Sequence, residues 1–172
     1  MRRYAGTDLC FVEVKLKDTR GATIKKRLPC SPAIYGRLDG KSMDFVRESY
    51  EGHYGKPFDY ELSPSAQVRY RRMTLVAKTG GERMTVDSEL EFDDGKTSCA
   101  ISPGIHILET KSSCGNGLAD RILRGLHQHP TKNCSKYCSG VALLQPGLKR
   151  NKFLPAIRKL SQLPITMMDG AS

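Results

Sequence analysis

Polar and apolar residues alternate through much of the first two thirds of the chain. Residues 10–17, CFVEVKLK, place Glu13 and Lys15 on one side of an extended strand and valines on the other. A short turn leads into a second run at residues 22–29. Two strands joined so closely predict an antiparallel hairpin, in which Lys25 lies beside Glu13 and Lys15.

Four more strand-like runs follow, separated by Gly-Gly, Asp-Gly and Pro-Gly pairs that are typical of turns. They cover residues 67–78, 83–92, 97–101 and 105–111. We expect these four strands to form an antiparallel meander in chain order. Together with the first hairpin, they are enough for a barrel or a strongly curved sheet.

The second and fourth of these runs carry charges on one face. Arg83, Thr85 and Asp87 alternate in the second run, and Glu109 and Lys111 point the same way at the end of the fourth. We expect Asp87 to hold a neighbouring Arg or Lys rather than a metal ion. Glu109 and Lys111 either line a polar space or form a solvated charge pair worth only ~0.2–1 kcal/mol.

Helical signals begin before the strand-rich block. Ser31 followed by Pro32 is a typical helix start, so we expect a short helix from there to Leu38. A second short helix is expected over residues 42–50. Residues 51–64 are rich in Gly, Pro and aromatic residues and are expected to form a connecting loop.

The last third of the chain is predicted to be helical. Leucine and isoleucine recur at helical spacing over residues 118–126. A further helix is expected from Ser135, with Tyr137, Val141 and Leu144 as its buried stripe. Residues 146–172 are basic and interrupted by proline, which predicts a loosely ordered tail.

The composition is that of a soluble globular domain. Of the 172 residues, 38% are hydrophobic and 27% are charged, and no apolar run is long enough to cross a membrane. The N-terminus is basic but lacks the apolar core of a signal peptide. We therefore expect a cytoplasmic protein whose cysteines are free thiols.

The net charge of +10 predicts an anionic partner, such as nucleic acid, phosphates or an acidic membrane surface. Many of the bases fall within the alternating strands, and the sequence has no long Lys/Arg run. This distribution favours a folded site lined with bases over a disordered basic arm.

One group of residues contains side chains that can bind zinc: His127, His129, Cys134 and Cys138. Their spacing matches no common structural zinc module. The favoured interpretation is two surface histidines and two half-buried thiols.

Seven short segments resemble one known family when they are taken in order: RRY, FVEVK, TIKKR, YRR, RMTVD, ILETK and SKY. The chain resembles the catalytic domain of the vacuolar transporter chaperone (VTC) family, the polyphosphate polymerases of the triphosphate tunnel superfamily. No single segment is specific for the family, but seven of them in the same order are hard to obtain by chance. The resemblance runs from Arg2 to Leu144, which defines a domain over residues 1–145.

The resemblance implies an α+β fold in which antiparallel strands form a tunnel-like barrel with flanking helices. It also implies a metal-dependent phosphotransferase that moves the terminal phosphoryl group of ATP onto a polyphosphate chain. ATP and polyphosphate are then the partners, a membrane-protein partner is compatible with the family, and no specific nucleic acid is expected. The oligomeric state stays open.

The roles of family residues pass to the matching positions of this sequence. Glu109 in ILETK resembles the glutamate that binds Mn²⁺ or Mg²⁺. Arg72, Arg83 and Lys136 resemble catalytic residues whose positive charge neutralises the phosphates during phosphoryl transfer. The implied phosphate ligands are Arg2, Arg3, Lys15, Lys25, Arg72, Arg83, Ser135 and Lys136.

Other interpretations stand beside the polymerase. The family's tunnel begins with strands that precede the RRY segment, and this chain starts inside that region, so we expect a barrel that is incomplete at its N-terminus. Such a chain either catalyses phosphoryl transfer or binds its ligand without catalysis. The alternatives are a tunnel triphosphatase and a non-catalytic module for polyphosphate or nucleic acid. Arg69, Arg71 and Arg72 also have a structural interpretation, as charges that protect an exposed sheet edge.

Overall fold

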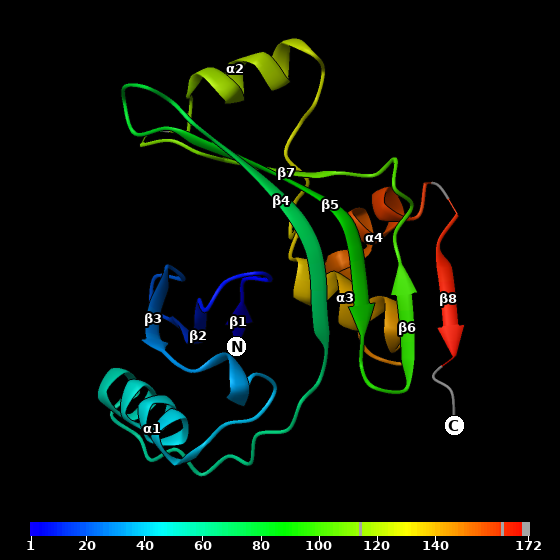
Figure 1. Ribbon diagram of the computed structural model, residues 1–172. Coiled ribbons are helices and arrows are strands. Elements are labelled where there is room, and N and C mark those ends of the chain that lie inside the picture. Colours follow the sequence, from blue (N-terminus) through cyan, green and yellow to red (C-terminus); the bar gives the residue numbers. More distant parts are fainter. Residues whose placement is uncertain (114, 163, 170–172) are drawn as a thin grey trace. The chain divides into compact units, whose positions relative to one another are not determined.

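The computed structural model describes residues 1–113, 115–162 and 164–169. They form two compact units, which divide between Ser63 and Pro64, and each contains helices and one antiparallel sheet (Figure 1). The predicted α+β class and the antiparallel sheets are confirmed. Within the described residues neither sheet closes into a barrel.

The first unit contains the predicted hairpin. Its strands are β1 (Arg2–Arg3), β2 (Cys10–Lys17) and β3 (Thr23–Pro29), in that order in the sheet. The register sets Lys15 opposite Lys25 and Glu13 opposite Arg27. The turn between β2 and β3 is tight because the Asp18 carboxylate accepts hydrogen bonds from two backbone N–H groups of the turn.

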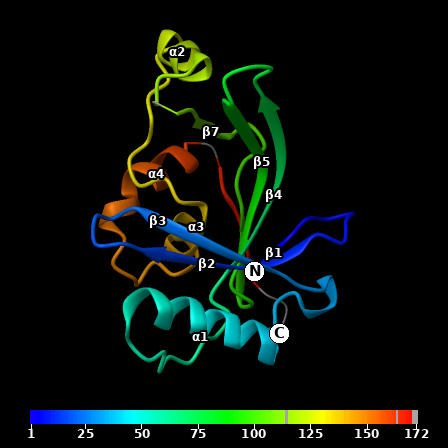
Figure 2. The ribbon, with the colours of Figure 1, turned by 90° about the vertical axis from the view of Figure 1, so that its left-hand side faces the viewer.

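One α-helix, α1 (Gly40–Tyr54), packs against β2 and β3 (Figure 2). It is longer at both ends than the helix predicted there. Asp39 caps its first turn by accepting a hydrogen bond from the N–H of Ser42 at 2.9 Å. Gly55 ends the helix with a left-handed φ of 64°.

The helix expected from Ser31 to Leu38 is wrong. Only a 3₁₀ turn, η1 (Pro32–Ile34), forms there, with the Ser31 hydroxyl as its cap. Gly36 takes a φ of 89°, a left-handed conformation that a right-handed helix cannot continue. The cap was therefore recognised correctly, but the glycine that ends the turn was not.

The second unit is built on a larger sheet. Its strands are β4 (Gln67–Val76), β5 (Arg83–Asp93), β6 (Thr97–Ala100), β7 (Ile107–Lys111) and β8 (Thr166–Asp169). Their order is β4-β5-β6-β8, and β7 also pairs with β5 (Figure 1). The expected meander is therefore wrong at its last step. Because β6 pairs only with residues 91–93 of β5, residues 83–87 remain for β7.

A bulge in the middle of β5 changes which residues face the core. Between Arg69 and Arg71 of β4 the pairing register shifts, so that β5 contains one extra residue at this point. Glu89 lies in the bulge and has a left-handed φ of 51°. Asp87 before the bulge and Leu90 after it are therefore both buried on the same face of the sheet.

The hydrophobic core lies between this sheet and two helices. α3 (Lys136–Leu144) and α4 (Leu154–Leu160) cover one face of the sheet (Figures 1 and 2). The buried cluster consists of Leu90, Phe92, Cys99, Ile101, Leu144 and Leu160. It is contiguous with the polar part of the same sheet face, because Asp87 and Leu90 belong to the same strand.

The helix predicted from Ser135 forms as α3, but its buried stripe differs from the predicted one. The Ser135 hydroxyl caps it by accepting a hydrogen bond from the N–H of Cys138 at 3.3 Å. Tyr137 is exposed, whereas Leu144 is buried as predicted, and Gly140 and Ala142 are buried as well. Gly140 faces the sheet and lies against the Phe92 ring, so the helix approaches the sheet closely at this point.

The C-terminal segment contributes to this core. After the 3₁₀ turn η2 (Asn151–Phe153), α4 buries Ile157 and Leu160, and β8 pairs with β6. This arrangement differs from the loosely ordered tail expected from the basic composition. The bases are compatible with packing, since Arg158 and Lys159 lie on the exposed side of α4.

α2 (Leu118–Gly125) forms where it was predicted, but none of its apolar side chains is fully buried, and of its leucines and isoleucine only Leu123 is partly buried. Leu118 and Ile122 are 57% and 54% exposed. Polar contacts attach the helix instead: the Asp120 carboxylate accepts hydrogen bonds from the hydroxyls of Thr110 and Ser112.

Gly140 is the position where the core tolerates no side chain. A Cβ added there would overlap the ring of Phe92, which is fully buried. We expect Gly140→Ala to lower the free energy of unfolding by about 1–3 kcal/mol, because the overpacked ring must move. Urea unfolding followed by circular dichroism measures this change.

The matched control is Gly125→Ala, at the end of α2. An added Cβ at Gly125 meets no atom within 4 Å, so this variant should be unchanged or stabilised by up to ~1 kcal/mol. Equal unfolding midpoints for the two variants would contradict the close packing of α3 on β5.

Candidate functional site

A buried carboxylate, Asp87 on β5, is the centre of the polar part of the second unit's sheet. Arg72, its cross-strand neighbour on β4, donates two hydrogen bonds to it, from Nε at 2.6 Å and from Nη2 at 2.8 Å. Lys136, the first residue of α3, places Nζ 2.6 Å from the same carboxylate. Because the Asp87 side chain is fully buried, its partners must come from the protein, and they come from two other elements.

The two bases keep Asp87 ionised. Burial alone would raise the pKa of the Asp87 carboxyl, but the hydrogen bonds from Arg72 and Lys136 outweigh burial and hold the pKa below its ordinary value. The hydrogen bonds to Asp87 also raise the pKa of the Arg72 guanidinium. Two cations therefore face one anion, which leaves a surplus of positive charge on this face.

Tyr70 supports both bases. Its ring centre lies 5.1 Å from the Arg72 guanidinium carbon and 5.5 Å from Lys136 Nζ, within the range of cation–π attraction. The interpretation of the sequence missed this residue. The signal was present in the YRR segment, since Tyr70 precedes Arg72 by two positions and therefore shares its face of the strand.

Four more polar side chains lie on the same face as Asp87. The register sets Thr85 opposite Glu109 and Arg83 opposite Lys111 across β5 and β7, and directly opposed residues share a face. Glu109 Oε1 lies 3.1 Å from Lys111 Nζ, so the two residues predicted to point the same way form an ion pair.

Glu109 is held in its ionised form. Partial burial would raise the pKa of its carboxyl, but the hydrogen bond from Lys111 and the charges of Lys111, Lys136 and Arg72 hold the pKa below its ordinary value. The charges that act on Glu109 include both partners of Asp87. Asp87 with Arg72 and Lys136, which we call the Asp87 cluster, and the ion pair of Glu109 and Lys111 therefore form one electrostatic site. With the neighbouring side chains of the same face we call it the β5 site: Arg72, Arg83, Thr85, Asp87, Glu109, Lys111 and Lys136.

The second unit thus brings together four of the residues predicted from the family resemblance: Arg72, Arg83, Glu109 and Lys136. The predicted fifth, Ser135, is the cap of the helix that Lys136 begins. Its hydroxyl oxygen already accepts a hydrogen bond from a backbone N–H, while its own hydrogen remains a donor.

The other predicted ligands belong to the first unit. Lys15 and Lys25 are a cross-strand pair on β2 and β3, and Arg2 and Arg3 make up β1, which pairs with β2. Arg2, opposite Phe11, lies on the same face as Lys15 and Lys25 and forms a second group of bases with them. Arg3, opposite Cys10, lies on the other face of this sheet.

An acid lies within this second group. Glu13 Oε1 lies 2.6 Å from Arg27 Nη2 and 3.6 Å from Lys25 Nζ. Burial raises the pKa of Glu13, but the hydrogen bond from Arg27, with the charges of Arg2 and Lys25, holds it below its ordinary value. As in the β5 site, bases outnumber the acid that orders them.

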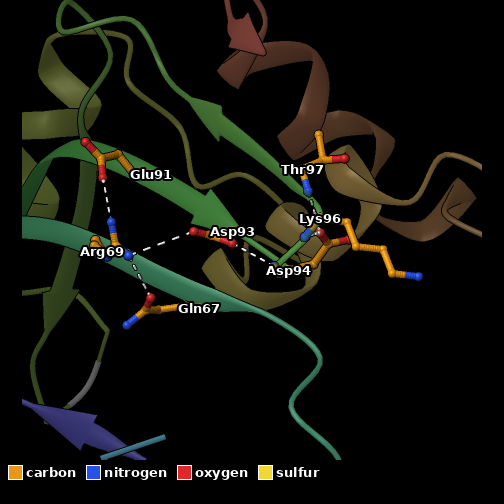
Figure 3. Close-up of polar contacts among 8 residues, drawn as sticks. Gln67, Arg69, Glu91, Asp93, Asp94, Lys96 and Thr97 are labelled. Carbon is orange, nitrogen blue, oxygen red and sulfur yellow. Dashed lines mark hydrogen bonds and ion pairs between the residues drawn. The ribbon is translucent and has the colours of Figure 1, made fainter. Parts of the chain in front are cut away.

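The remaining arginines of β4 lie on the opposite face from Arg72. Arg69 lies 3.6 Å from Glu91 and 3.9 Å from Asp93, as Figure 3 shows. Arg71 has a similar surface ion pair. Since β4 is the first strand in the order of its sheet, the edge interpretation suits Arg69 and Arg71. It does not suit Arg72, which is bound to a buried acid.

Two features are absent from the described part of the chain. His127, His129, Cys134 and Cys138 are all described, yet no group of three or more His, Cys, Asp or Glu that could hold a metal occurs among the described residues. No described helix combines the length and the apolarity that a bilayer crossing requires.

A comparison with protein families decides which family is involved. The family model of the VTC domain matches residues 1–145, which include the hairpin of the first unit and the whole β5 site. This chain belongs to the VTC domain family. The resemblance carried by the seven sequence segments is thereby confirmed. No curated protein and no solved structure proved similar enough to count as a match.

The VTC resemblance implies Mn²⁺ or Mg²⁺ at Glu109, and the donors present fit one mode of binding. Glu109 is an ionised oxygen donor, which suits a hard cation. The described residues offer no cage of three acidic or histidine ligands around it. These donors fit a metal ion that arrives with a phosphate chain, whose oxygens and waters complete the coordination.

Asp87 should be essential for the stability of the second unit. Asp87→Asn leaves Arg72 and Lys136 beside a neutral buried group, so we expect a loss of about 3 kcal/mol in the free energy of unfolding. Glu91→Gln is the matched control, because its ion pair with Arg69 is exposed and contributes less than ~1 kcal/mol. Urea unfolding at neutral pH measures both changes.

The pH dependence gives a second test of the same interaction. Because the pKa of Asp87 is lowered in the folded state, its stabilisation is fully present above about pH 4 and is lost as pH falls through the folded-state pKa. Asp87→Asn should therefore lose less stability than the wild type between neutral and acidic pH. If the free energy of unfolding fell equally with pH in the wild type and in Asp87→Asn, an ionised Asp87 in the folded state would be contradicted.

Proposed function

We propose that this chain binds ATP and polyphosphate and transfers the terminal phosphoryl group of ATP to the polyphosphate chain, in the tunnel manner of polyphosphate polymerases. The observation that supports this most is the Asp87 cluster, in which one buried acid fixes Arg72 and Lys136 in charged form. Phosphoryl transfer depends mainly on such preorganised positive charge, since the protein supplies little covalent chemistry.

Three bases of the β5 site, Arg72, Lys136 and Arg83, have a role in this proposal. The contacts with Asp87 use Nε and Nη2 of Arg72, so the guanidinium presents Nη1 to a further acceptor. Lys136 and Arg83 add donors on the same face, Arg83 from a more exposed position. Together they neutralise the phosphoryl oxygens on which charge accumulates.

Glu109 is the residue that would hold Mn²⁺ or Mg²⁺. The chemistry that such an ion would supply is positive charge that offsets the negative charge of the phosphate oxygens. The chain's own contribution is to keep Glu109 ionised and close to Arg72 and Lys136, as its lowered pKa reflects.

The bases of the first unit are assigned to the same ligand class. Lys15 and Lys25 form a cross-strand pair that can bind successive phosphates of an extended chain, with Arg2 as a further contact on the same face. Glu13 would hold the bases of this group in place, as Asp87 holds Arg72 and Lys136 in the β5 site.

Binding of tripolyphosphate tests the proposal without requiring turnover. A ligand that binds only the folded state raises the melting temperature. We expect tripolyphosphate to raise it by several degrees, and more in the presence of Mn²⁺. Arg83→Ala should lose most of the response, and Glu109→Gln should lose the part that depends on Mn²⁺.

Arg71→Ala is the matched control for Arg83→Ala, because Arg71 is an exposed arginine on the opposite face of the sheet. It should respond like the wild type. Equal losses in both arginine variants would indicate general attraction to a basic surface. No response in the wild type would contradict the proposed binding site.

Turnover is measured separately, by incubating the chain with ATP and Mn²⁺. A polymerase releases ADP and accumulates polyphosphate, whereas a triphosphatase releases inorganic phosphate. We expect ADP and polyphosphate, with both lost in Glu109→Gln. Release of inorganic phosphate without polyphosphate would contradict a polymerase and indicate a hydrolase.

A further inference from the structure

A buried hydroxyl in the β5 site has no partner. Within the described residues, three buried side-chain oxygens lack a hydrogen bond: Glu13 Oε1, Thr85 Oγ1 and Ser139 Oγ. Two of them have local explanations. Glu13 Oε1 lies 2.6 Å from Arg27 Nη2, and a serine within a helix, such as Ser139, can turn its hydroxyl to the carbonyl of the preceding turn.

Thr85 lies in the interior of β5, where no carbonyl of a preceding helical turn is in reach. Thr74 of β4 and Glu109 of β7 lie opposite it on the same face, yet its hydroxyl forms no hydrogen bond with either. The Thr85 side chain is only 6% exposed, so bulk water does not satisfy its hydroxyl. An unpaired buried hydroxyl costs free energy, which a ligand with a hydrogen-bond acceptor would restore.

The charges around Thr85 indicate that the hydrogen-bond acceptor belongs to an anion. It shares its face with Asp87 two positions along the strand and with Glu109 across the sheet. A lysine or arginine at this position would be neutralised by these acids. A hydroxyl stays uncharged and keeps its hydrogen for an incoming oxygen, while Arg72 and Lys136 supply the positive charge that attracts an anion.

We propose that Thr85 is a direct ligand of the bound phosphate chain and donates a hydrogen bond from its hydroxyl to a phosphoryl oxygen. This inference rests on the proposed function and adds an uncharged donor to the basic side chains of the β5 site. Access to the hydroxyl requires a neighbouring side chain to move. The neighbour across the sheet is Glu109. Its side chain is 43% exposed and its ion-pair partner Lys111 is also exposed, so Glu109 can turn away without leaving a buried charge unpaired.

The test compares tripolyphosphate affinity, by calorimetric titration with Mn²⁺ present, with the melting temperature of the ligand-free chain. Thr85→Val keeps the shape of the side chain and removes the hydroxyl. It should weaken tripolyphosphate about ten- to a hundredfold, the usual effect of losing a hydrogen bond to a charged group. It should also raise the ligand-free melting temperature, because the unpaired hydroxyl is gone.

Three further variants complete the test. Thr85→Ser keeps the hydroxyl and should retain the affinity, whereas Thr85→Ala should lose it as Thr85→Val does. Thr166→Val makes the same change at an exposed position of β8 and should alter neither property.

The outcomes separate this inference from the proposed function. If the wild type fails to bind tripolyphosphate, the proposed function fails and Thr85 has no role in it. If the wild type binds and Thr85→Val binds equally well, only the role of Thr85 is overturned. A lower melting temperature with unchanged affinity would assign the hydroxyl to structure, and an equal loss in Thr85→Ser would exclude the hydroxyl as the determinant.

Discussion

The arrangement of the second unit depends on one buried charge. Asp87 can remain ionised inside the protein only because Arg72 and Lys136 both bind it. These partners come from β4 and α3, so a single carboxylate fixes two strands and a helix relative to one another. The same contacts immobilise two bases on one face of the sheet, where Glu109 lies under their influence. Stability and the chemistry of the site therefore have a common origin.

The bulge at Glu89 makes this arrangement compatible with a hydrophobic core. In a regular strand, Asp87 and Leu90 would face opposite sides of the sheet. The extra residue turns both toward α3, so that the first half of β5 presents polar groups and the second half presents Leu90 and Phe92. Gly140 of α3 then allows the helix to approach the sheet closely. Lys136 reaches Asp87 from the start of this helix.

Alternation and turn signals were sufficient to predict most strands, because they are local properties of the chain. The faces of Arg83, Thr85 and Asp87, and the pairing of Asp87 with neighbouring bases, followed from the same local pattern. The pairing of β7 with β5 did not, since it depends on how much of β5 the short β6 leaves unpaired. Burial of α4 and exposure of Leu118 and Ile122 in α2 also depend on tertiary packing, which helical spacing alone does not encode. Tyr70 was missed because its role depends on both Arg72 and Lys136, and Lys136 is distant in sequence.

The central claim is that the face ordered by Asp87 binds a phosphate chain, and mapping that contact by NMR tests it most directly. Tripolyphosphate with Mg²⁺ would be titrated into the isotope-labelled chain while the backbone amide signals are followed. The account predicts that, within the second unit, the largest changes occur around Arg72, Thr85, Glu109 and Lys136, with small changes around Arg69 and Arg71 on the opposite face. Changes spread over the exposed bases of both faces, or confined to residues outside the β5 site, would contradict it.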